Sequence, residues 1–288
     1  LGLTGLGYRY SPRINLKSKD FKRILRQLPP RSLDQGVDSI NSMVETNRAR
    51  KLGEGYLTYY ENAFTLHTAP ILLFGTAIAT AAFPRLTERL AQNRVDLFRK
   101  EFLQVLQFII WIGAPIVVLC YFSRGYLARL IFKTGAPNIA LIFGFLTFAI
   151  LFRMIYMMFS RYFYAHKDTA TPLIVSLFAI CLNIVLAFSL ARPQVYGAAG
   201  LAIAQSIVAA SEVLILFVVI VWRDPHLFNK QFWASIMRIV SVTGFTVVGT
   251  YLIVALLPLN VNDRGFFALG FKLGGIVLVT MTIHVMAS

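Results

Sequence analysis

Seven apolar segments dominate the chain after residue 60, and each is long enough to cross a lipid bilayer as a helix. An α-helix rises about 1.5 Å per residue, so about 20 apolar residues span the hydrocarbon core. The segments cover residues 63–83, 102–122, 138–159, 173–191, 197–221, 239–262 and 265–287. Their number and length predict an all-α, polytopic helical membrane protein.

An eighth transmembrane helix is expected over residues 32–52, although charged and amide side chains interrupt its apolar pattern. Asn41, Glu45 and Arg48 are spaced so that they share one helical face, and Asp38 extends this face toward one end. A charge at the bilayer centre costs about 2.5–3.5 kcal/mol, so this face is expected to line a polar cavity. Two other interpretations stay open: the segment is a surface loop, or Glu45 and Arg48 pair with each other and only hold structure.

The composition agrees with a membrane protein, since 57% of the residues are apolar and only 14% are charged, with a mean hydropathy of +0.66. The net charge of +15 would suggest nucleic acid as the partner of a soluble chain. Here the basic residues lie between the apolar segments, which indicates contact with anionic membrane lipids and no nucleic-acid partner. Residues 1–31 are predicted to form a basic tail with an interfacial amphipathic helix over residues 15–28.

The distribution of these basic residues predicts the orientation of the chain. If the first helix starts in the cytoplasm, eighteen of the 28 Lys and Arg residues fall on the cytoplasmic side and nine on the other, with Arg153 inside a segment. This excess follows the positive-inside rule. Both ends of the chain are therefore expected in the cytoplasm. The chain opens at Leu1 without a Met, and an upstream part is expected to precede it.

The sequence carries no motif for catalysis or metal binding, so no metal or cofactor is expected. The histidines and cysteines lie in separate segments, at positions His67, His166, His226, His284, Cys120 and Cys181. His166 and Asp168 deserve comparison with membrane acyltransferases, which place a histidine and an acid at the interface. The favoured interpretation is a basic turn in which Asp168 or Thr169 caps the next helix.

Further polar side chains lie within the apolar segments. Four of them open the second helix and follow a helical repeat, which predicts a second hydrophilic stripe: Glu61, Asn62, Thr65 and Thr68. Arg153 and Glu212 are single charges inside apolar helices, where either an internal ion pair or a site role is expected. Together with Asn41, Glu45 and Arg48, these residues are the candidates for a substrate cavity.

Three stretches together resemble the MurJ/MviN family of lipid II flippases, within the MOP transporter superfamily. They are residues 40–45 (INSMVE), 70–87 (PILLFGTAIATAAFPRLT) and 161–172 (RYFYAHKDTATP). Residues 197–206 (GAAGLAIAQS) fit the helix that follows in the family. The resemblance covers about residues 29–222.

The resemblance implies a fourteen-helix transporter with two six-helix lobes and a final helix pair, and not an enzyme. Residues 32–222 would form the second lobe, and residues 223–288 a cytoplasmic loop and the final pair, with the first lobe absent from this chain. The implied activity is alternating-access transport of lipid II, a polyprenyl-diphosphate-linked peptidoglycan precursor, across the bacterial cytoplasmic membrane. Possible coupling to a monovalent cation or to the membrane potential, and contact with the cell-wall synthesis machinery, belong to the same expectation.

The sequence departs from the family at one place. Family members often carry an arginine in the second helix, five residues before the proline, where this chain has Thr65. A polar or acidic residue follows there one turn later, and this chain has Thr68. The missing guanidinium keeps three alternatives open: a flippase for another glycan lipid, a multidrug efflux transporter of the same superfamily, or a membrane-embedded transferase that uses His166.

Overall fold

A computed structural model describes residues 39, 42–132, 134–192, 194, 196–260, 263 and 266–288. Residues 42–51 are helical. The elements that follow are α2 (Tyr56–Pro70), η2 (Ile71–Thr76), α3 (Ala77–Ala91), α4 (Val95–Ile131), α5 (Ala136–Ala165), α6 (Ala170–Leu190), α7 (Ala198–Arg223), α8 (Lys230–Leu256) and α9 (Phe266–Ala287). The described part of the chain contains helices and turns but no strand.

The predicted all-α membrane architecture is confirmed. Seven helices are long and apolar enough to span a bilayer, and α2, η2 and α3 together form the first of them. Of the eighth expected helix over residues 32–52, the structure describes residue 39 and residues 42–51, which are helical. The basic tail of residues 1–31, with its expected amphipathic helix, lies outside the described residues.

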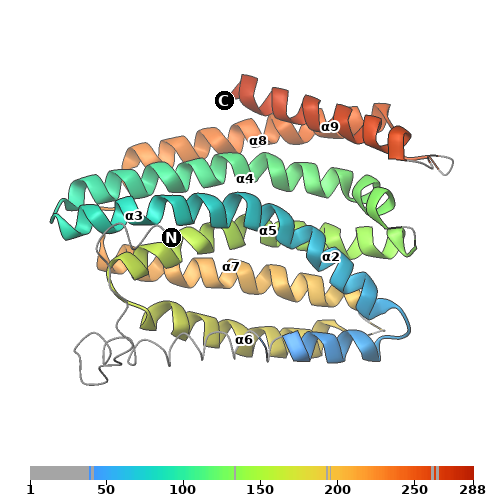
Figure 1. Cartoon of the computed structure of the whole chain (residues 1–288), viewed down its shortest axis with the longest axis horizontal. Helices are drawn as coiled ribbons and strands as arrows, with labels where there is room; N and C mark the ends of the chain where they lie inside the picture. The colour runs from blue at the N-terminus through green and yellow to red at the C-terminus, as the bar shows by residue number, and fades with distance from the viewer. Residues whose placement is uncertain are drawn as a thin grey trace, which may run out of the picture.

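The helices run side by side, with α5 in the middle (Figure 1). Helix α5 contacts α2, α4 and α7, while α6 packs mainly on α7. The final pair, α8 and α9, packs on α4 at the side of the bundle away from α6 (Figure 1). We call the helices from segment 42–51 to α7 the six-helix part, counting α2, η2 and α3 as one helix. The six-helix part and the final pair therefore meet along α4.

The first spanning helix contains one wide turn. Pro70 has no backbone N–H to donate and its ring crowds the preceding turn, and the π-helical turn η2 follows directly. In this turn Gly75 lies against α5, where an added Cβ would be 2.8 Å from Cγ of Met154. A glycine is needed here because any side chain would push α5 away.

The turn between α5 and α6 confirms the capping interpretation. Asp168 Oδ1 accepts hydrogen bonds from the backbone N–H groups of Ala170 and Thr171, each at 3.0 Å, and its Oδ2 lies 2.5 Å from Nη1 of Arg223. Burial by itself would raise the pKa of Asp168, but the hydrogen bonds from Thr171 and Arg223 outweigh it, and the pKa lies below its usual value. His166 Nδ1 contacts the carbonyl of Tyr162 at 2.8 Å.

Candidate functional site

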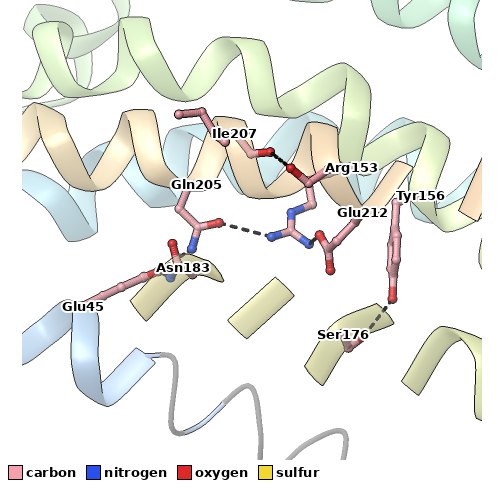
Figure 2. A network of polar contacts seen from close by, with 9 residues as sticks. Glu45, Arg153, Tyr156, Ser176, Asn183, Gln205, Ile207 and Glu212 are labelled. Atoms are coloured by element: carbon pink, nitrogen blue, oxygen red, sulfur yellow. Dashed lines mark hydrogen bonds and ion pairs between the residues drawn. The ribbon is translucent and has the colours of Figure 1, made fainter. Parts of the chain in front are cut away.

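Glu45 lies at the centre of a polar network inside the bundle, with 6% of its surface exposed. Its Oε2 accepts a hydrogen bond from the Tyr60 hydroxyl at 2.9 Å. Its Oε1 accepts one from the Asn183 amide at 2.7 Å and another from the Gln205 amide. The three donors come from α2, α6 and α7, so the carboxylate joins the helical segment 42–51 to three other helices. Figure 2 shows two of the donors, Asn183 and Gln205, beside Glu45.

Arg153 and Glu212 form the second half of this network. Arg153 Nη1 on α5 lies 2.6 Å from Glu212 Oε2 on α7, and Glu212 is 4% exposed. Arg153 Nη2 also donates to Gln205 Oε1 at 3.2 Å, while the nitrogen of the same amide donates to Glu45 (Figure 2). The expected internal ion pair is therefore present, and the Gln205 amide links it to Glu45.

A polar cavity of about 320 Å³ borders the network between α5, α6 and α7. Arg153, Asn183 and Glu212 line it together with hydroxyl groups, and Tyr156 Oη lies 3.1 Å from Ser176 Oγ across it (Figure 2). Charged and hydroxyl groups in an apolar bundle keep such a space wet, because water satisfies their remaining hydrogen bonds. The network therefore borders a space whose lining can form hydrogen bonds with water.

Arg48 contacts a different part of α6 from Glu45. Its guanidinium carbon lies 3.6 Å from the centroid of the Phe188 ring, a cation–π contact, and Nη2 is 3.5 Å from the Phe188 carbonyl oxygen. Glu45 reaches Asn183 of the same helix. The two charges thus share a face, as predicted, but each binds its own partner on α6.

The polar stripe of α2 lies away from this network. Tyr60, Ala63 and His67 are the buried residues of α2, the helix that packs on α5. The predicted stripe is exposed or half-buried instead, at Glu61, Asn62, Thr65 and Thr68. The hydroxyls of the two threonines donate to carbonyls of their own helix at 2.9 and 2.8 Å. The structure therefore does not bring the stripe together with Glu45 and Arg48.

Two candidates, Asp38 and Asn41, lie outside the described residues. The sequence analysis missed Tyr60, Asn183 and Gln205, which hold Glu45. The available signal for Asn183 and Gln205 was an amide side chain inside an otherwise apolar segment. No cluster of three or more His, Cys, Asp or Glu side chains with metal-binding geometry occurs among the described residues.

Comparisons with known proteins agree on one family. A family model described as "Lipid II flippase MurJ" matches residues 2–269. The chain is 23% identical over 286 residues to a probable lipid II flippase MurJ of Rhizobium meliloti (strain 1021), covering 97% of the chain and 52% of the relative. It is 30% identical over 205 residues to a probable lipid II flippase MurJ of Helicobacter pylori (strain J99), covering 68% of the chain and 43% of the relative. The chain thus spans about half the length of the curated relatives it matches.

Solved structures show the same fold. A lipid II flippase MurJ in an inward closed conformation superposes with a TM-score of 0.71 at 21% identity, covering 96% of this chain and 57% of that one. An outward-facing multidrug resistance MATE family transporter of the MOP superfamily superposes with a TM-score of 0.64 at 13% identity, covering 92% and 63%. At these identities, the likeness concerns the fold.

Proposed function

Because the chain belongs to the MurJ family of lipid II flippases, we propose that it carries out its part of flipping lipid II across the bacterial cytoplasmic membrane by alternating access. Residues 32–222 form one six-helix lobe in this proposal, and residues 223–288 a cytoplasmic loop and the final helix pair. Both ends of the chain face the cytoplasm, as the excess of basic residues on that side favours. A transporter in this family moves its substrate without chemical conversion.

The observation that carries the proposal is the charged network at membrane depth. Each charge in a hydrocarbon environment costs several kcal/mol, and such residues therefore mark substrate or ion pathways more often than plain scaffolding. Glu45, Arg153 and Glu212 lie beside a polar cavity and are joined through Gln205. A wet, charged interior of this kind supports the passage of a hydrated headgroup while the polyprenyl tail stays in lipid.

The network also supports coupling to the membrane potential or to a monovalent cation. Arg153 pairs directly with Glu212 and is linked to Glu45 through the Gln205 amide, so an ion pair and a second carboxylate lie in one network. Moving one charge through the whole potential is worth about 2.3 kcal/mol per 100 mV. A tilt of segment 42–51 that carries Glu45 along the membrane normal would therefore respond to the potential.

Complementation tests the proposal. The full-length gene with Glu45→Gln is expressed in cells depleted of their own flippase, and growth and lipid II translocation are measured. We expect both to fail, because the neutral amide cannot accept from all three donors. Glu54→Gln is the matched control, since the same chemical change falls on an exposed residue of the turn before α2. Normal translocation by the Glu45 variant would count against the proposal.

Efflux of a multidrug type is the second candidate. It is favoured by the absence of a guanidinium at Thr65 of the α2 stripe and by the fold shared with a MATE transporter. Cells that express the full-length protein would then extrude cationic dyes without rescuing flippase-depleted cells.

The transferase alternative draws little support, because Asp168 is engaged in a helix cap. His166→Ala should leave translocation intact.

A further inference from the structure

A second cavity lies at the edge of the bundle, apart from the Glu45 network. It has a volume of about 700 Å³ and lies between the first part of α4, the connection between α7 and α8, and the first part of α8. Its lining is rich in side chains that donate hydrogen bonds, among them Arg99, Lys100, Gln104 and Arg238. This is the region where the six-helix part meets the final pair.

The cavity carries positive charge that the described residues leave unneutralised. Arg99 is bound by Asp224 through two hydrogen bonds of 2.8 Å and lies 3.7 Å from Asp96, the one carboxylate in the lining. Lys100 and Arg238 are exposed, and no ion pair or hydrogen bond joins either side chain to another described residue. The cavity therefore favours an anion.

The two cations lie at the depth of lipid headgroups. Lys100 comes two residues before the apolar segment 102–122, and Arg238 directly before the segment 239–262. Since the ends of apolar segments mark the edge of the hydrocarbon core, both side chains reach the layer that holds lipid phosphates. Basic pockets between transmembrane helices at this level bind anionic headgroups.

An apolar groove continues from the cavity toward the membrane interior. A hollow of about 330 Å³ shares Gln107, Ser235 and Arg238 with the cavity. Its other lining residues are Phe108, Trp111, Ile239, Val242 and Ser288. Cationic and apolar surfaces thus follow one another along the α4–α8 seam. A cationic surface followed by an apolar groove matches a molecule with an anionic head and a hydrocarbon chain.

We propose that the α4–α8 seam is a binding site for an anionic phospholipid of the bilayer. Its phosphate lies between Lys100 and Arg238, and one acyl chain lies along Phe108, Trp111 and Ile239. A free phosphate ion would use the cavity but leave the groove unfilled. The bound lipid ties the final pair to the six-helix part, and the inference does not depend on which substrate the protein transports.

Fluorescence quenching by brominated lipids tests the site. In the full-length protein, Trp222, Trp233 and every tryptophan outside this chain are replaced by Phe, so that Trp111 in the groove is the reporter. The protein is reconstituted in phosphatidylcholine vesicles that contain either brominated phosphatidylglycerol or brominated phosphatidylcholine at equal mole fraction. We expect phosphatidylglycerol to be preferred about thirtyfold at Trp111, because two cations at about 1 kcal/mol each near the surface give about 2 kcal/mol.

Two double variants separate the site from general surface charge. Lys100→Gln with Arg238→Gln should reduce the preference to within about twofold of unity. Arg85→Gln with Lys167→Gln is the matched control, because it removes the same charge from exposed residues outside the cavity and should keep the preference. An equal loss in both double variants, or no preference in the parent protein, would overturn the proposal. Displacement by undecaprenyl diphosphate without a phosphatidylglycerol preference would overturn it too, in favour of a substrate site.

Discussion

The six-helix part and the final helix pair both bury polar side chains at membrane depth, but of different kinds. Between α8 and α9 the buried groups are Thr246, Thr250, Thr280 and His284, each at most 1% exposed. Thr250 Oγ1 lies 3.0 Å from Thr280 Oγ1, and Thr246 Oγ1 lies 3.1 Å from His284 Nδ1. In the six-helix part the buried polar groups include two carboxylates, of Glu45 and Glu212, and Glu212 borders a cavity with its partner Arg153.

This difference separates packing from function. Threonine hydroxyls donate to carbonyls of their own helix, as Thr250 does to Thr246, and so cost little in a membrane while they let two helices approach. Charges have no such local solution and need partners from other helices. Glu45 and Arg153 find theirs on α2, α6 and α7, where a change in helix positions must break or remake the contacts. The contacts of the charged network therefore depend on the conformation of the protein, whereas the threonine contacts between α8 and α9 stabilise one arrangement of these two helices.

The largest effect is expected from Arg153→Gln. This change leaves Glu212 buried without its guanidinium, which costs about 3 kcal/mol of stability. Thermal unfolding in detergent measures the loss. The double variant Arg153→Gln with Glu212→Gln should recover most of it, because the buried Glu212 charge is removed together with its partner. A double variant as unstable as the single one would contradict the view that charge governs this region.

A smaller effect is expected where a similar ion pair lies outside the membrane, at Asp168 and Arg223. Asp168→Ala removes the cap of α6 and should cost about 1 kcal/mol. Because the folded protein lowers the pKa of Asp168 below the usual 3.8, its contribution is present above that pH and is lost as the pH falls through the lowered value. Unfolding curves from pH 7 down to pH 3 should show this loss in the parent protein and not in the Ala variant.

The smallest effect is expected at the contact between α8 and α9. Thr250→Val with Thr280→Val removes both partners of one hydrogen bond and keeps the shape of the side chains. Stability should change by about 0.6 kcal/mol, the size found for hydrogen bonds between membrane helices. Lipid II translocation by the full-length protein should stay normal. A loss of translocation at unchanged stability would show that the contact between α8 and α9 takes part in transport.

The spanning helices were predictable because an apolar run of sufficient length has no other stable place than the membrane. The ends of these helices were harder to predict. For example, residues 138–159 were expected in one helix, whereas α5 covers Ala136–Ala165. The extra turn carries Arg161 and Tyr164, which continue the helix beyond the apolar run. Hydropathy marks where the hydrocarbon ends, whereas backbone hydrogen bonds decide where the helix ends.

The polar face of residues 41–48 was also visible in the sequence, but its partners were not. Asn183 and Gln205 lie 138 and 160 positions from Glu45, and only the packing of α6 and α7 brings them near. The spacing on α2 likewise showed a polar stripe but not that Tyr60, on another face of the helix, is the residue that contacts Glu45. A helical repeat shows which residues share a face, and the neighbouring helices decide which face turns inward.

The bridging amide of Gln205 has a chemical direction. Its nitrogen points to Glu45 and its oxygen to Arg153, and rotating the amide by half a turn would set like against like at both ends. Glutamate has no hydrogen to offer at one end, lysine no lone pair at the other, and asparagine is one methylene shorter. Glutamine thus joins the length and the donor–acceptor pair that the two contacts of position 205 require.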